Sequence, residues 1–379
     1  MENPHILPEI DTSNGIEFGI YTLGDHMPNP HTSERLSAKE RLDQILEMAK
    51  VAEQAGVDIF QVGESHQDYF VSQAHMVILS AIAQATKKLK IASSATIIST
   101  SDPVRVFEDA ATIDLLSGGR MEIVAGRASR LGLFDLLGYD FKNYTELFEE
   151  KLDLLLQINE NEVVNWEGEF RAPLKEAHVI PRPNNDKHGL PIWRAVGGPP
   201  ASAIRAGLAG LPMYITTLGG TSDYFQTSID IYRAVANRQG FDGKNLPLTT
   251  GGFLYANKDL DTAYREAYPH IDRGMMLANG QGFDRRLFAQ GKDVRSSINI
   301  GDPQLIIDKI LYQYELYGMD RYVAEIDFGG VPTDKIMNTL DIIGNEILPA
   351  VKKYTRDHKP SKSTRENPNE WEQKIDEIL

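Results

Sequence analysis

The chain has 379 residues, of which 41% are hydrophobic and 25% charged, and its formal net charge is −15. This composition is typical of a soluble globular enzyme, and an acidic surface disfavours nucleic acids and anionic membranes as partners. Because the chain contains no cysteine, disulfides, cysteine nucleophiles, zinc–thiolate sites and iron–sulfur clusters are excluded.

Strand and helix patterns alternate along most of the chain. Ser37 and Glu40 have the spacing of a capping box, which predicts the start of the first helix. The expected strands are 16–21, 58–63, 90–99, 121–126, 192–197, 212–216, 249–257 and 322–328. The expected helices are 37–54, 73–86, 103–117, 144–157, 201–209, 223–239, 260–278, 302–317 and 333–351.

Two internal stretches break this alternation. Residues 161–183 look irregular and are compatible with a small surface hairpin. Residues 280–301 are rich in glycine and charge, and we interpret them as a long mobile excursion, a kind of loop that is often a functional lid.

Eight strand–helix units are the number found in a (β/α)8 TIM barrel. The alternative is an open doubly wound sheet, but no glycine-rich dinucleotide fingerprint follows the first strand. We therefore predict an α/β chain with an N-terminal arm (1–15), a barrel with insertions at its C-terminal face (16–354) and a polar tail (355–379). The tail has a possible short helix that begins at Asn369 and contains Trp371.

Targeting signals are not evident in the sequence. Residues 1–18 lack a basic head followed by an apolar core, so we do not expect a signal peptide. No apolar run approaches the roughly 20 residues that span a bilayer. The expected location is the cytoplasm.

The most informative stretch is Pro103–Arg127, which predicts a helix, a Gly118-Gly119 stop and a short strand that delivers Arg127 at its end. In α/β enzymes ligands bind at the C-terminal ends of strands. A cation placed there, beside the small Gly126, is well positioned to hold a phosphate.

A second phosphate signal lies at the end of the fifth strand. Gly197-Gly198 precedes a helix, and a helix N-terminus offers free N–H groups and a favourable dipole to an anion. Ser202 would add a hydroxyl in the first turn. The alternative is a tight loop with no ligand.

His66, at the end of the second strand, is the best candidate for a general acid or base, because imidazole titrates near neutral pH. The alternative is an ordinary surface histidine. Glu64 is a further candidate, and its competing role is that of a buried carboxylate paired with a basic neighbour. Glu64, His66 and Asp327 match no trusted ligand spacing, so we assign no metal site.

The order of these motifs resembles the bacterial luciferase-like flavin monooxygenases over roughly residues 16–352. The resemblance rests on joint order and spacing, since no single motif is decisive. The motifs are ESH at Glu64–His66, PVR…ED…GR at Pro103–Arg120, GR at Gly126–Arg127, PRP at Pro181–Pro183, PIW at Pro191–Trp193, the GG turn at Gly197, GLPM at Gly210–Met213, and GDPQLIIDKI followed by YGMDRYVAEIDFGG near the C-terminus.

The resemblance implies a TIM barrel that binds reduced FMN and reacts it with O2 to a C4a-peroxide, which then oxygenates a small organic substrate. It also implies a separate NAD(P)H–flavin reductase as partner and a homodimer. In such enzymes the cofactor supplies the difficult chemistry, whereas the protein binds, orients and excludes water.

Carried over by position, the resemblance assigns several site residues. Ser94-Ala95 matches the pair beside the flavin ring, which is often joined by a non-prolyl cis peptide. His66 matches the second histidine of the family motif, and we assign it with Glu64 to catalysis. The residues matched to phosphate binding are Arg127, Gly197, Gly198, Pro199 and Ser202.

Four positions depart from the family pattern. Ser65 stands where the luciferases carry the histidine regarded as catalytic, and Gly126 stands where their α subunit has a reactive cysteine. Thr145 replaces a second phosphate arginine, and Ala128 replaces a common glycine. The sequence therefore indicates a luciferase-like oxidoreductase that is not itself a luciferase.

Two alternatives remain open at this stage. One is an oxidoreductase that uses a deazaflavin (F420) on the same barrel and transfers a hydride without oxygen. The other is a non-catalytic flavin-binding protein that kept the phosphate site and lost the base. His66 and a substrate loop are both present, which favours an enzyme.

Overall fold

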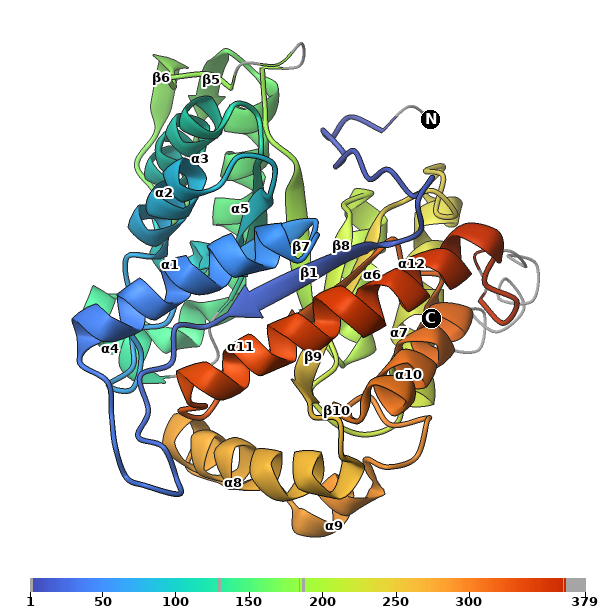
Figure 1. Ribbon diagram of the computed structural model, residues 1–379. Coiled ribbons are helices and arrows are strands. Elements are labelled where there is room, and N and C mark those ends of the chain that lie inside the picture. Colours follow the sequence, from blue (N-terminus) through green and yellow to red (C-terminus); the bar gives the residue numbers. More distant parts are fainter. Residues whose placement is uncertain (1–2, 128–130, 184, 186–187, 364, 366–379) are drawn as a thin grey trace.

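The computed structural model of the protein describes residues 3–127, 131–183, 185, 188–363 and 365. Within these residues, eight parallel strands form a closed barrel, in which β11 pairs with β1 and β8 with β9 (Figure 1). In order around the barrel the strands are β1 (Glu17–Thr22), β2 (Ile59–Val62), β3 (Lys90–Ile97), β4 (Met121–Gly126), β7 (Ile192–Gly197), β8 (Met213–Thr216), β9 (Leu248–Ala256) and β11 (Arg321–Glu325). The predicted TIM barrel is confirmed.

Helices surround this barrel, and their ends follow the expected capping chemistry. Ser37 and Glu40 form the predicted capping box of α1, Asp102 caps α3, and Gly118 ends α3 in the left-handed conformation. The helices are α1 (Ala38–Gln54), α2 (His75–Ala85), α3 (Pro103–Ser117), α4 (Leu131–Leu137), α5 (Tyr144–Glu160), α6 (Pro200–Ala209), α7 (Ser222–Arg238), α8 (Leu260–Asn279), α9 (Arg285–Gln290), α10 (Pro303–Tyr317), α11 (Thr333–Ile342) and α12 (Leu348–Asp357). A π-helical turn at Ile343–Ile347 joins the last two.

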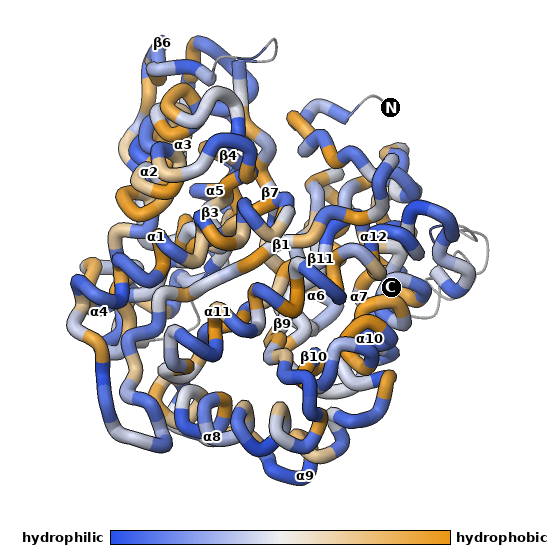
Figure 2. The backbone as a smooth tube through the Cα atoms, in the orientation of Figure 1, coloured by the Kyte–Doolittle hydropathy of each residue, from blue (hydrophilic) through white to orange (hydrophobic). Residues whose placement is uncertain are grey.

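The hydrophobic core lies mainly between the strands and these helices, where the apolar segments of the tube concentrate (Figure 2). At the N-terminal end of the barrel, the interior is instead filled by an ion-pair network. Arg321 donates to Glu17 over 2.8 Å and to both oxygens of Glu122 over 2.7 and 2.9 Å. The indole N–H of Trp193 donates to Glu122 over 2.8 Å, so four strands are tied together there.

Residues 161–183 contain the expected hairpin, in which β5 (Val163–Trp166) pairs antiparallel with β6 (Leu174–His178). Residues 280–301 differ from our prediction of a mobile excursion, because they contain α9 and a short strand, β10 (Asn299–Gly301), that pairs with β9. The physical reason is Lys309 of α10. Its buried ammonium donates to the carbonyls of Gly291, Ile298 and Ile300, which anchors the segment.

The beginning of the polar tail packs against the barrel. Ser361 donates to Glu315 of α10, and Arg233 of α7 donates to Ser363 over 3.0 Å. Arg365 forms an ion pair with Asp320 over 2.6 Å. The helix expected from Asn369, with Trp371, lies outside the described residues.

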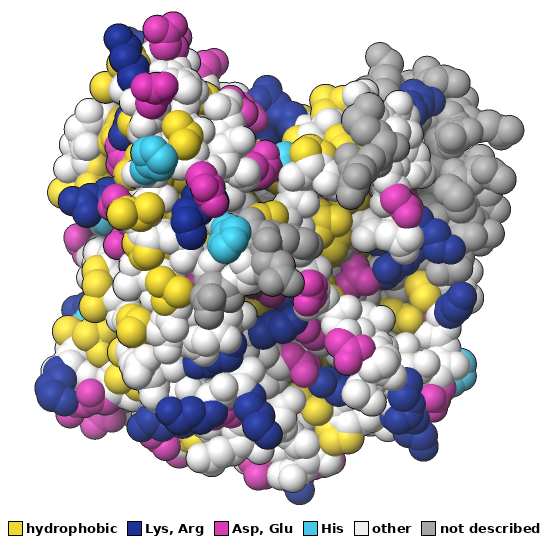
Figure 3. All heavy atoms as spheres, turned by 90° about the horizontal axis from the view of Figure 1, so that it is seen from above, with side chains coloured by type: hydrophobic (Ala, Val, Ile, Leu, Met, Phe, Trp, Pro, Cys, Tyr) yellow, Lys and Arg dark blue, Asp and Glu magenta, His cyan; other side chains and the backbone are white. Residues whose placement is uncertain are grey.

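Acidic and basic side chains are interspersed over the face shown in Figure 3. In the part of the chain that the structure describes, no helix combines the length and apolar character needed to cross a bilayer.

Candidate active site

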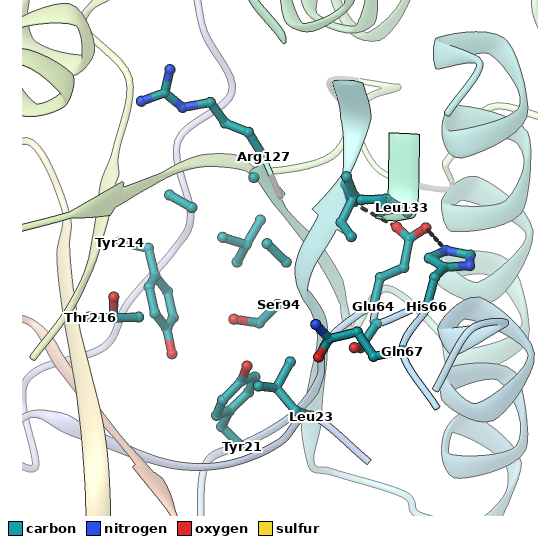
Figure 4. A pocket seen from close by; sticks show the side chains of 16 residues that line it. Tyr21, Leu23, Glu64, His66, Gln67, Ser94, Arg127, Leu133, Tyr214 and Thr216 are labelled. Atoms are coloured by element: carbon teal, nitrogen blue, oxygen red, sulfur yellow. Dashed lines mark hydrogen bonds and ion pairs between the residues drawn. The ribbon is translucent and has the colours of Figure 1, made fainter. Parts of the chain in front are cut away.

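A pocket of about 250 Å3 opens at the C-terminal ends of the strands (Figure 4). This is the end at which TIM-barrel enzymes carry their active sites. Its walls come from six strands and the loops that follow them, and they include α4. The lining residues are Tyr21, Leu23, Glu64, Ser65, His66, Gln67, Ser94, Ala95, Ile97, Val124, Gly126, Arg127, Leu133, Ala195, Tyr214 and Thr216.

Ser94 and Ala95 form one wall of the pocket, and the peptide bond between them is cis. The Tyr214 hydroxyl hydrogen-bonds with the Ser94 side chain, and burial raises the pKa of Tyr214 well above its usual range. Val124 and Ala195 add apolar surface beside them. These residues create a wall that is largely apolar and carries a few fixed polar groups.

Glu64 connects the second strand's end to two neighbouring elements. One carboxylate oxygen bonds to Nε2 of His66 over 2.7 Å, and the other accepts the backbone N–H of Ile97 over 2.7 Å. A carboxylate accepts hydrogen bonds, so neutral His66 carries its proton on Nε2 and leaves Nδ1 as an acceptor. The structure thus brings both proposed catalytic residues to one pocket wall, with Glu64 orienting His66.

His75 of α2 is a further histidine behind Glu64 that the sequence analysis did not identify. It is 5% exposed, and Nδ1 lies 3.9 Å from the Glu64 carboxylate while Nε2 bonds to Thr96 over 2.8 Å. Burial lowers the pKa of His75 below its ordinary value, more strongly than nearby Glu64 raises it.

Arg127 lies at the upper edge of the pocket in Figure 4, with its guanidinium over the Tyr144 ring at 4.8 Å from the ring centroid. Within the described residues, its polar partner is the Ser202 hydroxyl, 3.4 Å away, and it has no carboxylate at ion-pair distance. Two other arginines nearby, Arg194 and Arg205, both pair with Glu149. Arg127 is therefore a cation still available to an anionic ligand.

The Gly197–Ser202 segment meets Arg127 from the other side. α6 begins at Pro200, and no side chain of the described residues caps its N-terminus. Ser228 donates to the carbonyl of Gly198 over 2.7 Å, which fixes the turn. An uncapped N-terminus beside a free cation has the chemistry of an anion site. Gly197, Gly198, Pro199 and Ser202 do not line the pocket itself, and Ser202 is connected to it through its contact with Arg127.

The departures from the family pattern also have places in the structure. A side chain at Gly126 would bring its Cβ within 2.5 Å of the Ala95 Cβ, so the pocket excludes a cysteine there. Ser65 lines the pocket, and Thr145 lies in the first turn of α5. Ala128 lies outside the described residues. Asp327 does not join Glu64 and His66, because it bonds to Arg41 and Thr22.

Several pocket residues were missed by the sequence analysis, chief among them Tyr21, Tyr214 and Leu133. Tyr21 and Tyr214 face the barrel interior, but their strands are buried on both faces, so the sequence pattern does not show which side chains point inward. Leu133 belongs to α4, a short helix that no sequence pattern predicted.

Comparison with known proteins identifies a family that this chain matches. A family model described as "Luciferase-like monooxygenase" matches residues 16–321. Among curated relatives, the alkanal monooxygenase alpha chain of Photorhabdus laumondii is 23% identical over 90% of this chain and 99% of its own. The oxygenase component of the flavin-dependent trigonelline monooxygenase from Acinetobacter baylyi is 20% identical over 87% of this chain and 95% of its own.

Solved structures share the fold at low identity. Monooxygenase RslO1 from Streptomyces bottropensis superimposes with a TM-score of 0.74 at 20% identity and covers 88% of this chain and 99% of its own. An FMN complex of the oxygenating constituent of 3,6-diketocamphane monooxygenase from Pseudomonas putida gives 0.67 at 17% identity, with 88% and 98% covered. An F420-dependent reductase from Methanopyrus kandleri gives 0.66 at 19%, with 88% and 99% covered.

Proposed function

The chain belongs to the luciferase-like monooxygenase family, and we propose that it uses reduced FMN and O2 to oxygenate a small organic substrate. The observation that carries this proposal is the position of Arg127. Its guanidinium has no carboxylate partner in the described part of the chain and lies next to Ser202, in the first turn of α6. Arg127 also lines a pocket whose walls are largely apolar. A phosphate with an attached flat ring fits that arrangement.

The proposed cofactor contacts follow from the chemistry of the two ends of the site. Arg127, the Ser202 hydroxyl and the first free N–H groups of α6 would hold the FMN phosphate, next to the Gly197-Gly198-Pro199 turn. Ser94 and Ala95 would contact the ring system. When bound, the flavin supplies the oxygen-activating chemistry, and the protein orients it and excludes water.

His66 is the proposed proton-transfer residue, because it lines the pocket and Glu64 fixes its tautomer. Nδ1 would accept a proton from the substrate or return one to it. Glu64 would act through His66 and Ile97, since its oxygens bond to those residues. Both assignments concern the same wall of the pocket.

The partners are part of the same proposal. The name of the trigonelline relative describes an oxygenase component, which supports a separate NAD(P)H–flavin reductase for this chain. A homodimer, which is a family-level expectation, and a cytoplasmic location, which is expected from the sequence, complete the proposal.

A second candidate is hydride transfer with F420, because an F420-dependent reductase shares the fold. The departures at Ser65 and Thr145 are compatible with either cofactor. The phosphate pair of Arg127 and Ser202 favours FMN, whose phosphate is terminal and compact. A non-catalytic flavin binder is disfavoured by the oriented His66.

The deciding experiment mixes the purified chain with FMN, a flavin reductase, NADH and O2, and records stopped-flow spectra. We expect slow decay of an oxygen adduct of the reduced flavin that free flavin does not give. Tight binding of F420, with no such adduct, would overturn the FMN assignment. Flavin binding with neither adduct nor substrate oxidation, tested with sulfides, ketones and aldehydes, would favour the non-catalytic alternative.

A further inference from the structure

The barrel interior below the pocket contains a carboxyl group that the proposed reaction has not used. Arg321 and Val323 of β11 face the interior, because Arg321 bonds to Glu122 across the barrel and Val323 packs with Val124 and Trp193. Side chains alternate along a strand. Glu325 therefore also faces the interior, at the end nearer the pocket.

Strand register places Glu325 beside a residue of the pocket wall. Glu325 is the neighbour of Tyr21 on β1, and Tyr21 is the neighbour of Gln61 on β2. Tyr21 lines the pocket, whereas Glu325 and Gln61 do not. The three side chains are thus neighbours on the inner face of the barrel, with the tyrosine between an acid and an amide.

Glu325 and Gln61 are buried, and their polar atoms are poorly satisfied. Glu325 is 4% exposed, and its Oε1 has no hydrogen-bond partner among the described residues. Gln61 is fully buried, and neither polar atom of its amide has a partner there either. TIM-barrel interiors are usually filled by branched apolar side chains. Buried polar atoms without protein partners are commonly satisfied by ordered water.

No cation is available to pair with Glu325 in the described residues. Arg321 is bonded to Glu17 and Glu122, and Arg41 is bonded to Asp327 over 2.5 Å and to Asp25 over 3.4 Å. Other ionisable groups near Glu325 are the Asp327 and Asp25 carboxyls and the Tyr214 hydroxyl, together with Tyr255 and His270, which line a small second cavity with Glu325. An isolated buried carboxylate is very costly, so a carboxyl in this setting keeps its proton. Burial first, and then Asp327 and Asp25, raise the pKa of Glu325 well above its ordinary value.

We propose that Glu325 is a neutral carboxylic acid that stores a proton beneath the pocket, and that buried water held by Gln61 and Glu325 connects it past Tyr21 to the reaction site. The relay rests on the proposed oxygenase function. Glu325 does not touch the substrate. It acts through water that runs past Tyr21, and its role is to position the proton.

The atoms balance without a net proton from the protein. Reduced flavin (FMNH2), O2 and substrate give oxidised flavin, oxygenated substrate and water, so both hydrogens of that water come ultimately from the reduced flavin. Glu325 gives its proton to the oxygen that leaves as water and regains one from the hydrogens that the flavin loses. The carboxyl group is unchanged after each turnover.

The stored proton is tested without flavin. Infrared difference spectra of the wild-type chain and Glu325→Gln at pH 7 should show the carbonyl stretch of a protonated carboxyl group that only the wild type carries. Glu47→Gln, which alters an exposed carboxylate, should leave that band in place. A Glu325→Gln variant that keeps the band, or loses only carboxylate bands, would overturn the proposal.

The relay is tested in single turnovers with reduced FMN. We expect Glu325→Gln to slow product formation about 10- to 100-fold and to diminish the solvent deuterium isotope effect, with the flavin Kd unchanged. Gln61→Met should slow product formation to a similar extent, but the infrared band of the protonated carboxyl group should remain. Wild-type rates and isotope effects in both variants would refute the relay. A wild-type chain that binds flavin but oxygenates nothing would refute the oxygenase function and the relay with it, whereas the infrared band would still decide the stored proton.

Discussion

The two ends of the barrel interior use the same strands in opposite ways. At the N-terminal end, Glu17 of β1 and Arg321 of β11 belong to a network in which each charge has partners. Toward the C-terminal ends of the same two strands lie Tyr21 and Glu325. Here polar atoms of Gln61 and Glu325 have no hydrogen-bond partner among the described residues. Removing one partner of a buried ion pair is strongly destabilising, whereas buried polar atoms without protein partners mark a place where a ligand or water completes the structure.

The strongest test of the N-terminal end is Arg321→Met. The change leaves the carboxylates of Glu17 and Glu122 buried without their cation, so we expect a loss of about 3–5 kcal/mol in the free energy of unfolding. Urea denaturation followed by circular dichroism measures it. Lys39→Met breaks an exposed ion pair and should leave the free energy of unfolding nearly unchanged. Equal effects of the two changes would contradict the structural role of the network.

At the pocket end, His66→Gln should affect reaction and leave stability nearly unchanged. Loss of the imidazole removes proton transfer, so we expect product formation to fall by roughly 100-fold or more, with FMN binding retained. Single-turnover product analysis gives the rate, and flavin fluorescence gives the Kd. His178→Gln, on the exposed strand β6, is the matched control. An unaltered rate would remove His66 from the mechanism.

Arg127→Ala should weaken cofactor binding alone. A charge-assisted contact to phosphate contributes about 1.5–3 kcal/mol, so the Kd for FMN should rise roughly 10- to 100-fold. Titration with riboflavin, which has no phosphate, should show little difference between variant and wild type. Arg105→Ala, on the exposed face of α3, should change neither. An equal loss for FMN and riboflavin would place the phosphate elsewhere.

The smallest expected effect concerns His75, which lies between the pocket and the core. Burial lowers its pKa in the folded chain, whereas in the unfolded chain it titrates near 6.5. The unfolded state thus binds more protons as pH falls through about 6.5, and stability decreases, by at most about 1.4 kcal/mol per pH unit. His75→Gln should remove part of the stability loss between about pH 6.5 and 5 in urea titrations. The same acid dependence in both proteins would show that His75 titrates normally.

The sequence predicted the barrel because its evidence was local and repeated. The Ser37–Glu40 capping box and the glycine stop after α3 fix helix ends without reference to the rest of the chain. The approach of Arg127 to Ser202, 75 positions away, also followed, since parallel strands bring their C-terminal ends to one face.

Other features depended on tertiary contacts that no local pattern reports. Parallel strands are buried on both faces, so their hydrophobicity does not show that Tyr21, Tyr214 and Glu325 point inward. The glycines of residues 280–301 suggested mobility because the anchoring amine of Lys309 comes from a later helix. α4 is a short helix with no regular apolar spacing, so its contribution to the pocket wall through Leu133 was not predictable.

The anchoring of residues 291–300 by Lys309 has a consequence for how the protein opens. One amine, three backbone carbonyls and the Tyr264 hydroxyl make the segment and α10 a single cooperative unit of local unfolding. A protease that cleaves between Gly291 and Ile300 would therefore measure the release of the lysine from its carbonyls, and amide exchange in the segment should follow that in the first turns of α10.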